Sequence, residues 1–140
     1  LNIYENEEVN FKDRVKDLTN GMGADVIYDP VGGEVFDQSI RCINWGGRLL
    51  IIGFAGGTIP TLPVNYPLIK GFSVVGVRAG EFGRRAPILG KENIDIINSL
   101  ADDNKIRPHI CKVFDYKESK QALEYLENRK LIGKVVISIN

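Results

Sequence analysis

The sequence predicts an α/β fold built around a parallel β-sheet, and three observations lead to this prediction. An apolar run centred on residues 49–52 lies between glycines, which is typical of a strand buried on both faces of such a sheet. A strand over residues 24–29, a helix from Glu34 and a strand over residues 48–54 follow with short connections, in the order of a βαβ unit. The 140 residues, 44% of them hydrophobic, suffice for a core of about one domain.

Two helices are expected on either side of the strand over residues 24–29. The first follows a candidate N-cap at Asn10 and ends with Gly21 in the left-handed conformation. The second begins at Glu34 and ends at residues 45–47. Apolar residues at helical spacing define the inner faces of these helices: Phe11, Val15 and Leu18 in the first, and Phe36, Ile40 and Ile43 in the second.

The middle of the chain is expected to alternate loops with regular elements. A proline-bearing loop over residues 55–71 leads to a third strand over residues 72–77. A second loop, rich in Gly and Arg, covers residues 78–90, and a helix over residues 91–104 follows it. That helix presents three apolar residues on one face: Ile94, Ile97 and Ala101. Long loops in compact domains are usually functional or form interfaces.

After Pro108 the pattern indicates a closing β-α-β segment. Strands are expected over residues 110–114 and 134–139, with a helix between them. Asp115 and Glu118 have the spacing of a capping box at the start of this helix. The helix is expected to end near residue 128 and to bury three residues: Ala122, Leu123 and Leu126.

Composition excludes several classes of protein. Lys plus Arg and Asp plus Glu both number 18, a balance that argues against nucleic-acid or anionic-membrane partners. No apolar run approaches the roughly 20 residues that a membrane span needs, and a cytoplasmic protein is expected. Cys42 and Cys111 are interpreted as buried free thiols. Because the chain begins with residues 1–4 as if at the end of a strand, and without Met, we expect a fragment of a longer protein.

Small residues gather where the three central strands end. The positions are Val31 and Gly32 after the first strand, Gly53, Phe54 and Ala55 after the second, and Gly76 and Val77 at the end of the third. Ligands of open parallel sheets bind outside the carboxyl ends of the strands. Missing side chains there allow a ligand to lie against the backbone. The sequence therefore predicts a ligand crevice at this edge of the sheet.

A phosphate-binding turn is missing from the chain. No Gly-x-Gly-x-x-Gly follows a strand, and residues 53–57 do not have that spacing. The helix start at Gly33 is a poor substitute, because the carboxylates of Glu34 and Asp37 would oppose a phosphate. If a dinucleotide binds, its phosphates are held by residues outside this chain.

Candidate catalytic residues are scarce. His109 is the single histidine and is interpreted as structural or exposed, since one His and two distant cysteines give no metal-ligand spacing. Asp25 and Asp29 lie in one strand and do not form an acid–base pair. Five cations remain open between solvent exposure and a ligand contact: Arg78, Arg84 and Arg85 in a loop, and Arg129 and Lys134 beside the last turn. We therefore predict neither a catalytic side chain nor a metal site.

Three motifs in this order resemble the medium-chain dehydrogenase/reductases, specifically their zinc-free quinone oxidoreductase (zeta-crystallin-like) branch. The motifs occupy residues 25–33, residues 51–57 with the prolines and Lys70 beyond, and residues 73–77. The closing Gly-Lys-Val-Val at residues 133–136 fits the same branch, so the resemblance covers essentially the whole chain.

The resemblance implies the second half of a Rossmann-type parallel sheet with flanking helices, plus a C-terminal β-α-β return segment. Residues 1–105 would belong to the dinucleotide-binding domain and residues 106–140 to the substrate domain. NADPH, with NADH as the alternative, would contact eight residues: Val31, Gly32, Gly53, Phe54, Ala55, Gly76, Val77 and Arg129. A small-molecule substrate, a quinone or another activated double bond, would be reduced by hydride transfer. Homodimers would form through the strand over residues 72–77.

Two other functions are weighed against this one. A Rossmann-like methyltransferase fragment also places an acidic residue and Pro-x-Gly at a strand end, as in residues 29–32, but it needs a closing antiparallel hairpin. A non-catalytic dimerisation module is the second alternative. The fragment alone is expected to be inactive because the phosphate-binding part is absent.

Overall fold

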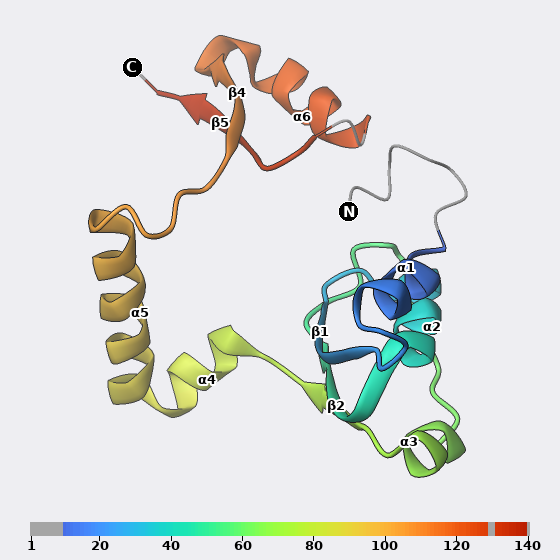
Figure 1. The fold of residues 1–140 in the computed structure, drawn as a ribbon. Coiled ribbons are helices and arrows are strands. Elements are labelled where there is room, and N and C mark those ends of the chain that lie inside the picture. Colours follow the sequence, from blue (N-terminus) through green and yellow to red (C-terminus); the bar gives the residue numbers. More distant parts are fainter. Residues whose placement is uncertain (1–9, 129–130, 140) are drawn as a thin grey trace. The chain divides into compact units, whose positions relative to one another are not determined.

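A computed structural model describes residues 10–128 and 131–139 of the chain (Figure 1). The chain divides into two compact units, one up to Glu81 and one from Phe82 onward. Each unit has its own small parallel sheet. The expected division at residue 105 concerns domain membership in a longer protein, and it stays a prediction.

The sheet of the first unit confirms the predicted parallel α/β arrangement. It contains β1 (Ala24–Asp29), β2 (Ile43–Ile51) and β3 (Ser73–Gly76), in the order β1-β2-β3. Both neighbouring pairs are parallel. β1, the helix α2 (Gly33–Cys42) and β2 form the expected βαβ unit.

The core of the first unit lies between α2 and the sheet. The helix α1 (Phe11–Leu18) packs against α2, and α2 packs against β1 and β2 (Figure 1). The buried core residues are Phe36, Ile40, Ile43, Leu49 and Phe72, with Ile27, Ile51 and Leu62 packed beside them. Within this unit the helices cover one face of the sheet. Val26 and Tyr28 of β1 are exposed on the other face, whereas the apolar run predicted to be buried on both faces, residues 49–52, is buried at Leu49 and half-buried at the next three positions.

The junction between α2 and β2 differs from the prediction. α2 ends at Cys42, not at residues 45–47, and β2 begins at Ile43. The pairing passes from Ala24 opposite Ile43 to Val26 opposite Arg48, so the chain bulges in between. A Cβ on Gly47 would lie 2.8 Å from Ile43 Cγ1, which shows how tightly the bulge folds back. Ile43 is buried as predicted, but it reaches the core from the strand.

Two segments that were expected to be loops contain helices. α3 (Asn65–Lys70) lies inside the proline-bearing segment, where Pro67 falls in the first turn, a place that tolerates proline. Gly71 ends it in the left-handed conformation. α4 (Ala79–Arg85) occupies the second expected loop.

The helix α5 (Pro87–Asp102) begins one turn earlier than predicted. Pro87 takes the first helical position, where its missing N–H costs no hydrogen bond. The structure shows no buried residue on α5. Ile94 and Ile97 of the predicted inner face are 56% and 49% exposed, respectively.

The second unit contains a further βαβ segment, as predicted. β4 (Ile110–Asp115) and β5 (Lys134–Ser138) are parallel, and the short 3-10 helix η1 (Tyr116–Glu118) and α6 (Ser119–Glu127) connect them. The predicted capping box is present: Asp115 Oδ1 accepts a hydrogen bond from Lys117 N at 2.9 Å, and Glu118 Oε2 accepts one from Asp115 N at 3.2 Å. Ala122 is buried as expected, whereas Leu123 and Leu126 are exposed.

Several local predictions at chain turns and cysteines have clear outcomes. Asn10 occupies the N-cap position of α1 as predicted, but its side chain makes no capping hydrogen bond; its Nδ2 donates to Asp13 Oδ2 at 2.6 Å. Gly21 takes the expected left-handed conformation after α1.

Both cysteines are free thiols; Cys42 is buried and Cys111 is half-buried. In the described ranges, no helix combines the length and the apolar character that crossing a bilayer requires.

Candidate functional site

The three strands of the first unit end at one edge of the sheet. Asp29 pairs with Ile51, and Ile51 pairs with Gly76, so the last residues of the strands form one row. Val77 N donates to Ile51 O at 3.0 Å and continues this row. We call residues 29–33, 52–58 and 76–77 the carboxyl edge. The structure thus brings seven of the eight predicted ligand-binding residues to one place; the eighth, Arg129, lies outside the described residues.

A buried carboxylate shapes the first turn of the carboxyl edge. Asp29 is 2% exposed, and its Oδ1 accepts hydrogen bonds from Val31 N at 2.8 Å and from Gly32 N at 2.9 Å. Gly32 has φ of 72°, a value that favours glycine, and it precedes the first residue of α2. The sequence pattern indicated the turn but not the side chain that holds it.

The loop after β2 is hydrogen-bonded to this turn. Ile52 N and Gly53 N both donate to Asp29 O, at 2.9 and 3.4 Å. Ala55 N donates to Pro30 O at 3.0 Å, and Gly56 N donates to Val31 O at 2.9 Å. The two loops therefore form one hydrogen-bonded layer.

These bonds determine what kind of ligand the carboxyl edge can accept. Most of its N–H groups already donate within the chain, namely those of Val31, Gly32, Ile52, Gly53, Ala55, Gly56, Gly57 and Val77. Sites for phosphate need several free N–H groups that converge on the anion. In addition, Glu34 lies in the first turn of α2, where its charge disfavours an anion. The geometry agrees with the absence of a phosphate-binding motif in the chain.

The glycines of the carboxyl edge serve two different purposes. A Cβ on Gly32 would lie 2.9 Å from Thr58 O and 3.1 Å from Phe54 Cδ1, so this glycine lets the two loops pack together. A Cβ on Gly76 would meet nothing within 4 Å, and one on Gly53 would make an ordinary contact with Pro30 O at 3.4 Å. Gly53 and Gly76 therefore leave space at the surface, whereas Gly32 is required by internal packing.

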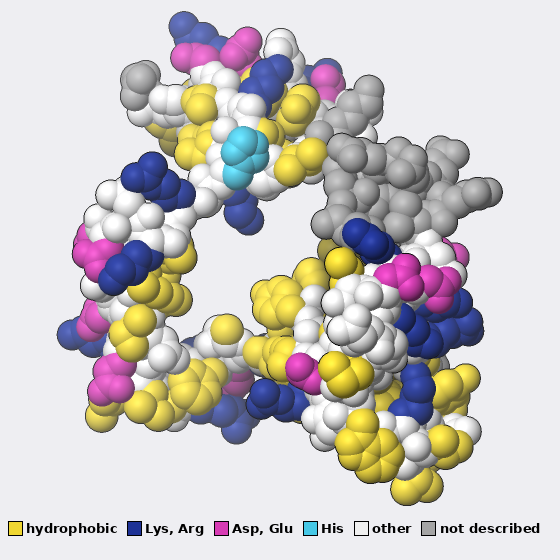
Figure 2. Space-filling view, viewed as in Figure 1, with side chains coloured by type: hydrophobic (Ala, Val, Ile, Leu, Met, Phe, Trp, Pro, Cys, Tyr) yellow, Lys and Arg dark blue, Asp and Glu magenta, His cyan; other side chains and the backbone are white. Residues whose placement is uncertain are grey.

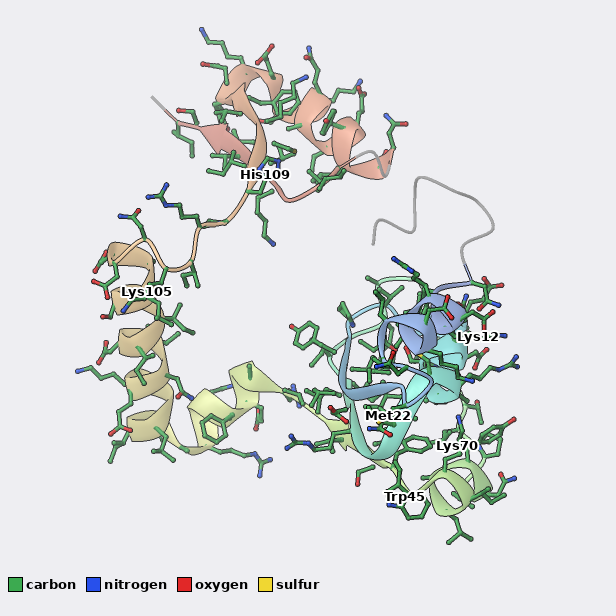
Figure 3. All side chains as sticks on the ribbon, in the orientation of Figure 1. Lys12, Met22, Trp45, Lys70, Lys105 and His109 are labelled. Carbon is green, nitrogen blue, oxygen red and sulfur yellow. The ribbon has the colours of Figure 1, made fainter. Side chains whose placement is uncertain are left out.

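Of the other candidate residues, Arg78 directly follows Val77 of the carboxyl edge, whereas His109, Arg84, Arg85 and Lys134 belong to other segments of the chain. Figure 3 shows His109 at the start of β4; it is exposed, and its carbonyl accepts a hydrogen bond from Lys134 N at 2.8 Å. Arg84 and Arg85 belong to α4 and not to a loop. Among residues 10–128 and 131–139, the His, Cys, Asp and Glu side chains do not gather in any group of three or more that could hold a metal ion. These described residues do not form a zinc site.

A lysine whose contact the sequence did not predict supports α2 from the opposite end. Lys70 of α3 donates from Nζ to Ile40 O, in the last turn of α2, at 2.6 Å. Burial lowers the pKa of Lys70, and nearby Lys16 lowers it further. Burial also raises the pKa of the Cys42 thiol, while Lys70 acts in the opposite direction. Lys70 thus supports the last turn of α2, and neither Lys70 nor Cys42 is part of the carboxyl edge.

Comparison with known proteins places this geometry in a family. The family model described as zinc-binding dehydrogenase matches residues 3–137. The quinone oxidoreductase-like protein 2 homolog of Nematostella vectensis is 40% identical over 130 residues, which are 92% of this chain and 36% of that protein. Quinone oxidoreductase-like protein 2 of Bos taurus is 32% identical over 128 residues, 91% of this chain and 37% of that protein. The chain spans little more than a third of the length of these relatives.

Solved structures show the same fold. A probable oxidoreductase from Mycobacterium abscessus has a TM-score of 0.74 and 28% identity, and the match covers 94% of this chain and 38% of that one. A quinone oxidoreductase from Pseudomonas syringae pv. Tomato DC3000 has a TM-score of 0.76 at 21% identity, over 94% of this chain and 41% of that one, a likeness of fold alone. Taken with the match over residues 3–137, these comparisons show that the chain belongs to the zinc-binding dehydrogenase family.

Proposed function

We propose that this chain is the nicotinamide-side part of an oxidoreductase that reduces quinones or other activated double bonds with NADPH, NADH being the alternative cofactor. Support comes from the family and from the names of relatives up to 40% identical, which are quinone oxidoreductase-like proteins. Since the chain spans about a third of their length, activity belongs to a longer protein that includes it. We expect the chain alone to be inactive.

The observation that carries this proposal is the chemistry of the carboxyl edge. A nicotinamide ring is flat and carries no phosphate, so its face needs open backbone and apolar surface to lie against. Gly53 and Gly76 provide such surface, and Phe54 is 41% exposed beside them. The proposed cofactor contacts are Val31, Gly32, Gly53, Phe54, Ala55, Gly76 and Val77, together with Arg129 outside the described residues.

The reaction needs little from this chain beyond positioning. When bound, the reduced nicotinamide supplies a hydride with its electron pair, and solvent supplies the proton that completes reduction of the double bond. The residues of the carboxyl edge would hold the ring face at a fixed distance from the substrate, which is a large catalytic effect in itself. A catalytic mechanism without zinc stays a prediction.

The methyltransferase alternative has less support. It needs an antiparallel hairpin at the edge of the sheet, whereas every strand pair within residues 10–128 and 131–139 is parallel. The family match also covers the segment, residues 29–32, on which that alternative rested.

Ligand titration tests the proposal. The full-length protein and this chain are titrated with NADPH, NADH and S-adenosylmethionine by calorimetry, and the labelled chain is followed by NMR. We expect the full-length protein to bind a nicotinamide cofactor and this chain to respond weakly, with amide shifts confined to Gly53, Gly76 and Val77.

An internal control comes from Trp45. It lies near the start of β2, at the end of the strand opposite the carboxyl edge (Figure 3), so its indole signal should not move. Binding of S-adenosylmethionine alone by the full-length protein would overturn the proposal.

We also propose that the full-length protein forms a homodimer through the strand over residues 72–77. β3 is an edge strand that pairs only with β2 among the described residues. Val74, Val75 and Val77 are each 38% exposed. An edge strand with exposed valines is a surface on which a second copy can extend the sheet.

A further inference from the structure

Asp29 is a buried carboxylate that the proposed reaction does not use directly. It is 2% exposed, and no described lysine or arginine forms an ion pair with it. Burying a carboxylate costs free energy unless hydrogen bonds replace its water. The bonds from Val31 N and Gly32 N, at 2.8 and 2.9 Å, supply that replacement. The visible role of the charged Asp29 side chain is thus to hold the conformation of one turn.

The turn that Asp29 shapes is the template for the next loop. With Val31 N and Gly32 N directed at the Asp29 side chain, the carbonyls of residues 29–31 accept bonds from the loop after β2. Three of these bonds are between 2.9 and 3.0 Å: Ile52 N to Asp29 O, Ala55 N to Pro30 O and Gly56 N to Val31 O. A change in the first turn is therefore transmitted to Gly53, Phe54 and Ala55.

Close packing makes this transmission rigid. Gly32 and Thr58 approach so closely that a Cβ on Gly32 would lie 2.9 Å from Thr58 O. A Cβ on Gly56 would lie 3.0 Å from Val31 O. The layer has no slack in which one loop could move while the other stays in place.

We propose that Asp29 is a positioning residue, which sets the distance and tilt of the carboxyl edge against the nicotinamide ring without touching the cofactor. This inference rests on the proposed function. It extends that function by giving one side chain control over five of the proposed contacts: Val31, Gly32, Gly53, Phe54 and Ala55.

Two substitutions separate the chemistry of the side chain. Asp29→Asn keeps one oxygen that can accept both N–H bonds, but it adds an NH₂ group. Asp29→Ala removes the acceptor and leaves two N–H groups without a partner at a buried position. Ser39→Ala is the matched control, because Ser39 is 1% exposed in the same unit and, among the described residues, its Oγ bonds Val35 O within α2 and no residue of the carboxyl edge.

The first experiment does not depend on cofactor or activity. Amide hydrogen exchange is measured on this chain in the four forms. In Asp29→Ala the amides of Val31 and Gly32, and also those of Ala55 and Gly56, should exchange about tenfold faster or more. Asp29→Asn should lie between wild type and Asp29→Ala, which keeps the test valid if the alanine variant does not fold. Unchanged exchange at Ala55 and Gly56 in both variants would overturn the link between the loops.

The second experiment measures hydride transfer in the full-length protein. With saturating cofactor, Asp29→Ala should lower kcat about 100-fold, as misplacement by about 1 Å can do. It should also reduce the selectivity between the two C4 hydrogens of deuterated NADPH. Asp29→Asn should restore most of both quantities, and Ser39→Ala should change neither. A loss of active protein with normal kcat per folded molecule and normal selectivity would show a structural role only, and would sink the inference.

Failure of the two proposals can be told apart. If wild type neither binds nor oxidises a nicotinamide cofactor, the proposed function fails, and the catalytic part of this inference fails with it. The exchange experiment still decides whether Asp29 holds the two loops together.

Discussion

At the residue scale, glycines with similar sequence signatures are required for different physical reasons. Gly32 combines φ of 72° with a carbonyl 2.9 Å from the place of a Cβ. Gly57 has φ of 85° but open space around it, and Gly76 has open space without a positive φ. Backbone strain and steric overlap can therefore be separated within one loop cluster.

Alanine substitutions at these positions should differ in a defined order. Gly32→Ala combines left-handed strain with overlap and should lower the free energy of unfolding by about 3 kcal/mol. Gly57→Ala carries strain alone, about 1 kcal/mol, and Gly76→Ala should stay within about 0.5 kcal/mol. Denaturant unfolding measures all three. Equal costs for Gly32→Ala and Gly57→Ala would show that the contact with Thr58 is not a constraint.

Two titratable side chains at the C-terminal end of α2, Cys42 and Lys70, have opposite effects on how stability changes at alkaline pH. Burial raises the pKa of Cys42 above 9.0, so the folded state keeps this proton longer than the unfolded state does. Stability from Cys42 is therefore complete below about pH 9 and is lost as the pH rises beyond it. Burial lowers the pKa of Lys70 below 10.5, so the folded lysine loses its proton first and stability rises with pH up to that value.

Cys42→Ala should isolate the first effect. The variant should be less stable than wild type near neutral pH, because a buried side chain becomes smaller. The difference in free energy of unfolding should shrink as the pH rises above about 9, because only wild type loses the thiol contribution. Urea unfolding over this pH range measures it, with Ser39→Ala as a control whose difference from wild type should not vary. A constant difference for Cys42→Ala would contradict the burial of an intact thiol.

At the element scale, the first unit leaves apolar surface on β3 and α3. Figure 2 shows hydrophobic side chains exposed over α3, where Val64, Leu68 and Ile69 are 85%, 81% and 71% exposed. Trp45 is 75% exposed, and its ring packs so closely on Gly71, just after α3, that a Cβ there would lie 2.7 Å from it. Apolar side chains this exposed typically mark a protein interface.

The edge strand offers a direct test of the proposed dimer. Val75→Lys places a charge on the exposed face of β3, where edge strands of monomeric proteins commonly carry lysine. Val26→Lys is the control, since Val26 is 48% exposed on the same face of the sheet but on β1. Sedimentation equilibrium of the full-length protein should give a dimer for wild type and Val26→Lys, and a monomer for Val75→Lys. A wild-type monomer, or a dimer of Val75→Lys, would refute pairing through β3.

At the scale of the whole molecule, the chain has a carboxyl edge but no phosphate-binding motif. The two relatives described above are roughly two and a half times as long, since the matched 130 and 128 residues are 36% and 37% of them. In a nicotinamide dinucleotide the pyrophosphate lies between two nucleosides, and the contacts proposed for the carboxyl edge are with the nicotinamide nucleoside. The different responses expected of this chain and of the full-length protein follow directly from this division.

The sequence by itself determined the parallel βαβ order, the row of small residues at the strand ends and the capping box at Asp115. These features depend on periodicity, on glycine and on contacts within a few residues, which a pattern records. It did not determine the helix α3, the bulge after Ile43 or the outward position of Leu123 and Leu126, because these depend on which surfaces meet. Only the tertiary structure could show that Asp29 holds the turn on which the next loop is hydrogen-bonded. The two loops are about twenty residues apart in sequence. They meet because the chain returns through α2 and β2, and a pattern among neighbouring residues contains no information on such a contact.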